Sequence, residues 1–265
     1  MLHQINTPVS RKLLKQRLRG VTGKQDFVAC LSAENLLQRI EKPDEAQGQE
    51  KPRFMSLYER DTGLSRELVE QGLMIDQVPF NMIEVGPEQL TSMLATSQYS
   101  HLISNLAFDW VDAGAFIGLI DYLLKPDGEF WFSCYGPQTA NSTRLILSDI
   151  DQYTHFNEFY DLRDVGDALL GAGFKAVVLE SFVTNLEYDS VDALLADAVR
   201  VFGVNTHPGR RKGLMPGGVL GEFRKRVEKE IQANGKFTEQ VEILIAHGKK
   251  PSVPDLSGVI PVRQG

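Results

Sequence analysis

The sequence predicts an α/β fold: a doubly wound, mostly parallel sheet with a helical insertion before its last strand. Two apolar runs, at 101–107 and 129–134, flank a stretch of helical periodicity at 110–124, and Lys-Pro-Asp-Gly at 125–128 closes that stretch with a tight turn. Strand, helix, turn and strand make a βαβ unit, and apolar strands buried on both faces are typical of parallel sheets. Because such sheets bind ligands at the carboxyl ends of their strands, we expect the functional site beside Asn105.

The part of the chain ahead of this unit alternates helical and extended patterns. Apolar residues near helical spacing predict a helix over 27–40, and Gly72 marks the end of another. The expected helices are 27–40, 65–72 and 87–95, and the expected strands are 53–58 and 78–85.

The part after the unit continues the alternation. The expected helices are 138–150, 162–170, 191–202 and 219–232, and the expected strands are 174–183 and 237–246. We expect the last strand at or near one edge of the sheet, and an antiparallel direction stays open. The chain then divides into a basic, helical N-terminal segment (1–50), one domain (51–250) and a flexible tail (251–265).

Composition narrows the class of protein. The 265 residues are 42% apolar, which suits one α/β domain, and no stretch approaches the ~20 apolar residues of a membrane helix. The chain starts without an apolar secretory signal, and Cys30 and Cys134 form no paired motif, so we expect a cytoplasmic protein. A net charge of -7 argues against nucleic-acid binding.

Basic residues nevertheless gather in two places, at 11–24 and at 210–229. Such clusters are commonly solvated helix faces. The alternative interpretation is that they dock an acidic partner or an anionic ligand.

Seven ordered blocks carry a resemblance to a known family. They are 104–111, 124–128, 132–139, 153–159, 164–170, 209–214 and 241–247. Over about 100–249 the chain resembles a class I S-adenosylmethionine-dependent methyltransferase, and more narrowly the malonyl-acyl-carrier-protein O-methyltransferases of biotin synthesis. A mitochondrial complex I assembly factor shares much of the same pattern.

The resemblance implies a Rossmann-like fold, S-adenosylmethionine as cofactor and acyl carrier protein as partner. It places the cofactor beside Asp61, Thr62, Gly63 and Asn105. A carboxylate substrate is already ionised at neutral pH, so methyl transfer to it needs no general base, and we assign no catalytic residue. The substrate carboxylate needs a cation instead, and the candidates are Arg210 and Arg211, with Arg144 and Arg163 behind them.

The front of the chain departs from the family pattern. Of the family's glycine loop, expected at 57–63, only Thr62 and Gly63 survive. Between Gly72 and Val85 there is too little chain for a second strand, its helix and a third strand. The family's acid for the ribose would have to be replaced, with Asp76 and Glu84 as candidates. We therefore expect an eroded cofactor site.

Three hypotheses stay open from the sequence. The protein is a methyltransferase acting on malonyl-carrier protein, a non-catalytic relative that keeps the carrier-docking surface, or an assembly or interaction factor. No spacing of His, Cys, Asp or Glu indicates a metal site, and no nucleophile elbow or phosphate loop is present.

Overall fold

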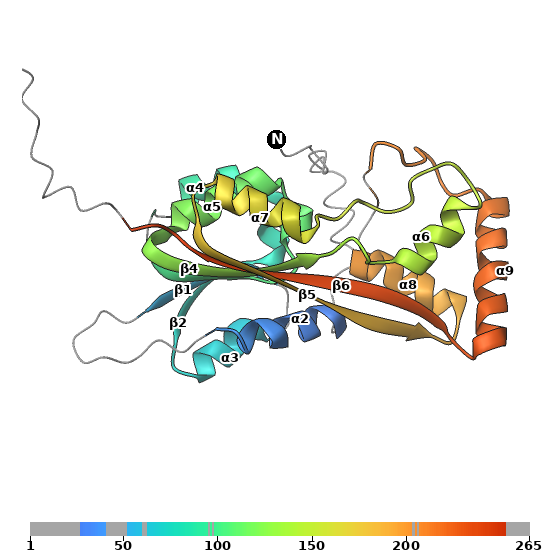
Figure 1. Ribbon diagram of the computed structural model, residues 1–265, viewed down its shortest axis with the longest axis horizontal. Coiled ribbons are helices and arrows are strands. Elements are labelled where there is room, and N and C mark those ends of the chain that lie inside the picture. Colours follow the sequence, from blue (N-terminus) through green and yellow to red (C-terminus); the bar gives the residue numbers. More distant parts are fainter. Residues whose placement is uncertain are drawn as a thin grey trace, which may run out of the picture.

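A computed structural model describes residues 27–40, 52–59, 63–94, 96, 98–202, 205 and 207–252. Its centre is a six-stranded sheet in the order β2-β1-β3-β4-β6-β5 (Figure 1). The strands are β1 (Arg53–Glu59), β2 (Met74–Pro79), β3 (Tyr99–Ser104), β4 (Leu124–Tyr135), β5 (Lys175–Tyr188) and β6 (Phe237–Lys249).

Strand directions confirm the expected sheet. The pairs β1–β2, β1–β3 and β3–β4 are parallel. The last strand, β6, is antiparallel to both of its neighbours, β4 and β5, and lies one position in from the edge. The fold is thus α/β with a mostly parallel sheet, as predicted.

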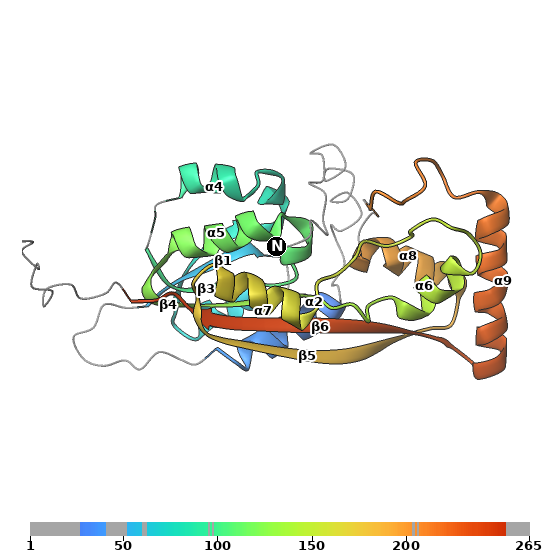
Figure 2. The ribbon, with the colours of Figure 1, turned by 45° about the horizontal axis from the view of Figure 1, so that its top comes forward.

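Helices cover both faces of the sheet. The helices α2 (Phe27–Leu37) and α3 (Leu64–Glu70) lie on one face, and α4 (Pro87–Met93), α5 (Ala113–Leu123) and α7 (Leu162–Gly171) lie on the other (Figure 1). At one end of the molecule, α6 (Asn141–Ser148), α8 (Val191–Phe202) and α9 (Gly217–Asn234) gather beyond the main layers (Figure 2). The helical insertion before the last strand therefore forms a small lobe.

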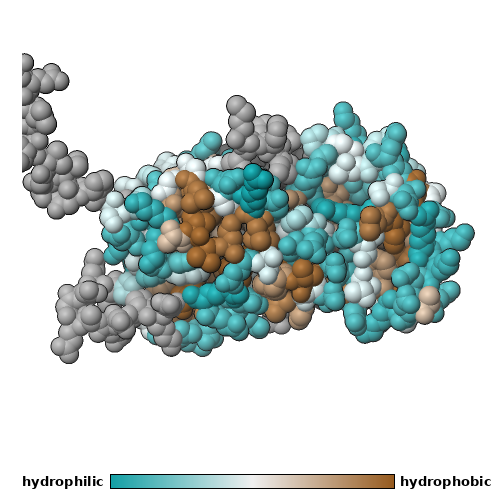
Figure 3. Space-filling view, in the orientation of Figure 1, coloured by the Kyte–Doolittle hydropathy of each residue, from teal (hydrophilic) through white to brown (hydrophobic). Residues whose placement is uncertain are grey.

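The buried side chains form three clusters. One cluster includes Leu102, Phe116 and Phe132, and a second, which includes Ala29 and Leu36 of α2, contains Ile103. A third cluster includes Phe223 of α9. Figure 3 shows that apolar side chains reach the viewed surface mainly over α5 and α7 and around α6.

Two local predictions were wrong. The strand expected over 78–85 stops at Pro79, where β2 ends, and a 3₁₀ helix, η1 (Phe80–Glu84), follows. Phe80 and Ile83 are both buried, which is a helical spacing rather than an alternation. The Lys-Pro-Asp-Gly segment is not a turn outside the sheet. It lies within the bounds of β4, where the pairing with β3 shifts register between Tyr99 and His101.

The region between Gly72 and Val85 is shortened as expected, since it contains a single strand, β2, between α3 and η1. The boundaries at 50 and 250 stay predictions, and most of the basic N-terminal segment and of the tail lies outside the described residues. Across the described ranges, every helix falls short of the length and apolar character that crossing a membrane requires.

Candidate active site

The carboxyl ends of β1, β3 and β4 meet at one edge of the sheet because these strands are parallel. At this edge Ser104 Oγ donates a hydrogen bond of 2.8 Å to the Leu57 carbonyl and so ties β3 to β1. Another short 3₁₀ helix, η2 (Phe108–Trp110), follows β3, and Asp109 Oδ2 accepts a hydrogen bond of 2.9 Å from the Tyr135 amide at the end of β4. The edge is thus closed by polar bonds between neighbouring strand ends.

Asn105 lies at this edge but is completely buried. Its Nδ2 donates to the Ala29 carbonyl of α2 at 2.9 Å, and its Oδ1 accepts from Ser133 Oγ at 3.0 Å. Ser133 Oγ also accepts from Ser32 Oγ at 2.8 Å. These bonds fasten α2 across the ends of β3 and β4, and a role of Asn105 in cofactor binding stays a prediction.

The predicted glycine loop follows β1. Gly63 is in the left-handed region at φ 78° and precedes α3, and a Cβ added to it would meet nothing within 4 Å. The backbone there has the freedom that close approach of a ligand requires. Asp61 and Thr62, the other two candidates, lie outside the described residues.

Tyr58 occupies the end of β1 in an unusual conformation. Its φ is 55°, and the pairing of β1 with β2 shifts between Leu57 and Glu59 as a result. A positive φ is strained for a bulky side chain. The Tyr58 ring is fully buried in the same cluster as Phe80 and Phe108, burial raises the pKa of its phenol, and its hydroxyl has no hydrogen-bond partner among the described residues.

Asp76 does not supply the acidic residue that the family uses to bind the ribose of its cofactor. Asp76 lies opposite Met55 in the register, three positions before β2 ends. Its Oδ2 already accepts bonds from Arg53 Nη2 at 2.7 Å and from the Tyr99 hydroxyl at 2.9 Å. Of Glu84, only the backbone, in η1, is described.

The described residues therefore depart from the family's cofactor cradle in two places. The end of β2 carries Val78 and Pro79 where the family has its acid, and Tyr58 fills the start of the loop with a buried ring. Gly63 is the part of the expected cradle that the structure shows in a suitable conformation.

A second group of polar residues gathers where 151–155 meets 205–211. The Arg211 guanidinium lies 4.1 Å from the centroid of the Tyr153 ring, and its Nη2 is 3.9 Å from Asp151 Oδ2. Asp151 Oδ1 accepts from the Tyr153 amide at 2.9 Å and is 2.7 Å from His155 Nε2. Arg211 Nε is buried and has no hydrogen bond to any described residue.

This arrangement holds a cation in place beside a carboxylate. Burial alone would raise the pKa of Asp151, but the bonds from Tyr153 and His155 and the charge of Arg211 outweigh it and lower that pKa. Arg210 differs, since its amide and its Nη1 both donate to the His207 carbonyl, at 3.0 and 3.2 Å. The structure thus brings both predicted arginines into one loop but gives them different surroundings.

Contacts with Asn157 and Phe159 connect the segment after His155 to the end of β4 and to the segment that leaves it. The Phe159 ring lies 5.6 Å from that of Tyr135. Arg144 donates to the Pro137 carbonyl at 3.2 Å and to that of Asn157 at 2.8 Å, and burial lowers its pKa. Arg144 therefore braces the segment leaving β4 rather than facing a ligand, whereas Arg163 makes an exposed ion pair with Asp167.

Asp151 and Tyr153 were missed as site residues from the sequence. A signal existed for both: Tyr153 belongs to the block at 153–159, and Asp151 precedes His155 by four positions. Their role depends on Arg211, which is distant in sequence, so the pattern alone could not pair them.

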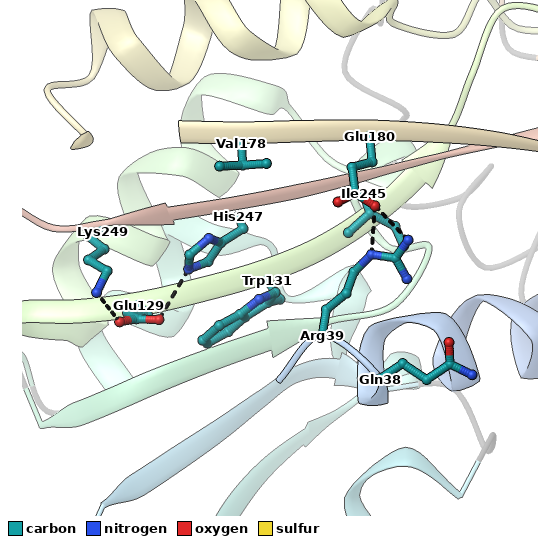
Figure 4. A pocket seen from close by; sticks show the side chains of 9 residues that line it. All are labelled: Gln38, Arg39, Glu129, Trp131, Val178, Glu180, Ile245, His247 and Lys249. Atoms are coloured by element: carbon teal, nitrogen blue, oxygen red, sulfur yellow. Dashed lines mark hydrogen bonds and ion pairs between the residues drawn. The ribbon is translucent and has the colours of Figure 1, made fainter. Parts of the chain in front are cut away.

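A separate hollow of about 460 Å³ lies against β4, β5 and β6 beside the end of α2 (Figure 4). Trp131 and His247 both line it, and their rings stack at 4.5 Å. On its other side the Trp131 ring stacks on His101 at 5.8 Å. The charged side chains that line it already pair with each other: Arg39 with Glu180, and His247 and Lys249 with Glu129. Nothing in this hollow therefore calls for a ligand.

No group of three His, Cys, Asp or Glu side chains within the described ranges could hold a metal ion. The two cysteines, Cys30 and Cys134, are not joined by a disulfide.

Comparison with known proteins addresses the family. The chain is 33% identical over 175 residues to the malonyl-[acyl-carrier protein] O-methyltransferase of Methylovorus sp. (strain MP688), covering 64% of this chain and 58% of that protein. It is 32% identical over 160 residues to the protein of the same name from Gallionella capsiferriformans (strain ES-2), covering 60% of this chain and 55% of that one. This chain is a sequence relative of malonyl-[acyl-carrier protein] O-methyltransferases.

The resemblance seen in the sequence blocks is thus confirmed, although the chain spans little more than half the length of these curated relatives. No protein-family model matches the chain. Among solved structures, a putative methyltransferase from Bacillus halodurans is similar at a TM-score of 0.48 and 11% identity, over 84% of this chain and 100% of that one. A likeness at that level carries no information about function.

Proposed function

We propose that the protein transfers a methyl group to the free carboxylate of a malonyl group held on acyl carrier protein. The observation that supports this proposal is the 33% identity over 175 residues to a protein of that name. The two cysteines, which are not joined by a disulfide, suit the reducing cytoplasm in which we propose that it works.

Methyl transfer to a carboxylate requires few functional groups from the protein. The bond that would form joins a carboxylate oxygen to the methyl carbon, and the bond that would break joins that carbon to the sulfonium sulfur of the donor, which would leave as a neutral thioether. The carboxylate is ionised at neutral pH, so no side chain has to remove a proton. What remains is to hold the carboxylate in position and to exclude water.

Arg211 is the residue that we assign to the substrate carboxylate. Its guanidinium is held against the Tyr153 ring, and its buried Nε lacks a partner among the described residues. A guanidinium offers a carboxylate paired N–H donors in a fixed plane. Asp151 beside it weakens the attraction for an anion and so tunes it.

A second candidate function is favoured by the buried Tyr58 ring and by the engagement of Asp76. In that alternative the protein has lost S-adenosylmethionine binding but still binds the carrier or another partner. Each hydrogen bond lost from a buried cradle costs about 1–3 kcal/mol, so two or three losses reduce affinity about a thousandfold.

The test is to incubate the full chain with malonyl-acyl carrier protein and methyl-labelled S-adenosylmethionine and to measure the labelled methyl ester. Calorimetry measures cofactor binding and carrier binding separately. Ester formation supports the first function. Carrier binding with neither ester nor cofactor binding at millimolar concentration supports the second, and the absence of all three signals overturns both.

A further inference from the structure

The loop ahead of α9 has an anchored part and a projecting part. The anchored part is fixed to the segment at 151–155: Gly209 O accepts from the Thr154 amide at 3.2 Å, and Asn205 Nδ2 donates to the Thr154 carbonyl at 2.6 Å. Arg211 adds its contacts with Tyr153 and Asp151. The base of the loop is therefore held in place.

The projecting part is the tip at 212–215, Lys-Gly-Leu-Met. Leu214 is 95% exposed and Met215 is 38% exposed. Lys212 is exposed too, and no ion pair joins it to another described residue. The tip thus presents an apolar side chain and a cation directly beyond the site that holds Arg211.

An exposed leucine alone means little, because folded proteins carry many apolar surface atoms. The charge around this one is more informative. The chain carries a net charge of -7, which on average repels an acidic protein, whereas 210–212 supplies three cations in succession, of which Arg211 lies beside Asp151. Local charge of opposite sign steers association to one place and fixes the orientation of the partner.

We propose that the tip at 212–215 is the docking surface for acyl carrier protein, with Lys212 pairing with an acidic side chain of the carrier and Leu214 packing against its apolar surface. This inference rests on the proposed function, since the carrier is the partner assigned there. It adds that recognition of the carrier and recognition of the malonyl carboxylate are carried by successive residues of one loop.

The test compares two double variants with the same change of charge. Lys212→Glu with Leu214→Asp alters the tip. Lys175→Glu with Leu170→Asp is the control, because Leu170 is 59% exposed at the end of α7 and Lys175 is exposed at the start of β5. The helix α7 lies well away from α8 and α9 (Figure 1). We expect the tip variant to raise the dissociation constant for malonyl-acyl carrier protein at least about tenfold, less at high salt, and the control to change it less than about twofold.

Malonyl-pantetheine, which lacks the carrier protein, separates the two claims. Loss of carrier binding by the tip variant with unchanged binding of malonyl-pantetheine supports the docking surface. Equal carrier binding by the tip variant and the unaltered chain overturns the docking surface alone. An unaltered chain that binds neither compound overturns the proposed function and the docking surface together.

Discussion

Ser133 Oγ donates a hydrogen bond of 3.0 Å to Asn105 Oδ1 and thereby joins β4 to the residue that follows β3. Because Asn105 also bonds to the Ala29 carbonyl, one buried amide connects two strands and α2. The polar residues after β3 therefore hold the edge of the sheet together at the place where a parallel sheet binds its ligands.

Replacing Asn105 should test this structural role. Asn105→Ala removes two buried hydrogen bonds, one from Ser133 Oγ and one to the Ala29 carbonyl, so we expect the free energy of unfolding to fall by about 2–4 kcal/mol. Asn234→Ala is the control, because its Nδ2 bonds to Glu230 on an exposed face of α9, and we expect a change below about 0.5 kcal/mol. Urea unfolding measures both, and equal stabilities of the two variants would contradict the role.

The Tyr58 hydroxyl offers a second test of stability. Tyr58→Phe removes a buried hydroxyl that has no partner among the described residues, so we expect stability to be unchanged or to rise by up to about 1 kcal/mol. Tyr99→Phe removes a hydroxyl that bonds to Asp76 at 2.9 Å, and we expect a loss of about 1 kcal/mol. A loss for Tyr58→Phe as large as that for Tyr99→Phe would show that the Tyr58 hydroxyl has a partner after all.

His101 should make stability depend on pH. Burial lowers the pKa of His101 to about 4, although the charge of Glu129 opposes this shift. The unfolded chain binds a proton at about 6.5 and the folded chain does not, so stability is complete above pH 6.5 and falls by up to about 3 kcal/mol as pH drops towards 4.

Denaturant unfolding at several pH values measures this dependence, with His101→Phe as the comparison. The variant keeps a ring between Phe54 and Trp131, which lie 4.3 and 5.8 Å from His101, but it cannot be protonated. We expect a shallower fall in stability for the variant over this range. Parallel curves for the two proteins would mean that other groups cause the fall.

Arg211 and Asp151 should have opposite effects on binding of the malonyl carrier. Arg211→Lys loses the planar guanidinium that lies over Tyr153, and we expect affinity to drop about tenfold. Asp151→Asn removes a negative charge beside Arg211, so we expect an anionic ligand to bind several-fold more tightly.

Arg163→Lys is the control for this pair, because Arg163 makes only an exposed ion pair with Asp167 at 3.7 Å. Titration calorimetry with malonyl-acyl carrier protein measures all three variants. If Asp151→Asn weakens binding while the protein stays folded, Asp151 belongs to the ligand site itself rather than opposing the anion.

Most of the fold could be predicted because long periodic segments determine it. The helix at 27–40 and the strand at 237–246 begin at the same residues as α2 and β6, whereas the strand expected at 101–107 overlaps β3 only at 101–104. Short segments were harder: 78–85 changes from strand to 3₁₀ helix at Pro79, where two or three residues cannot distinguish the two spacings.

The candidate site was predictable only in part. Arg210 and Arg211 could be singled out by charge, but only the fold shows that Arg211 meets Tyr153 and Asp151, more than fifty residues away in the chain. Asn105 could be placed at the strand edge, yet whether its amide faces a ligand or the protein depends on α2, whose Ala29 precedes it by 76 residues.

The position of β6 has a consequence for biogenesis. This strand spans residues 237–249 yet separates β4 from β5, so β5 has no neighbour to bond to until β6 is in place. On the ribosome, a nascent chain that has emerged only as far as α9 must wait with β5 and one side of β4 unsatisfied. Cotranslational assembly can thus complete the parallel half early, while closure of the antiparallel half is delayed until β6 has left the exit tunnel.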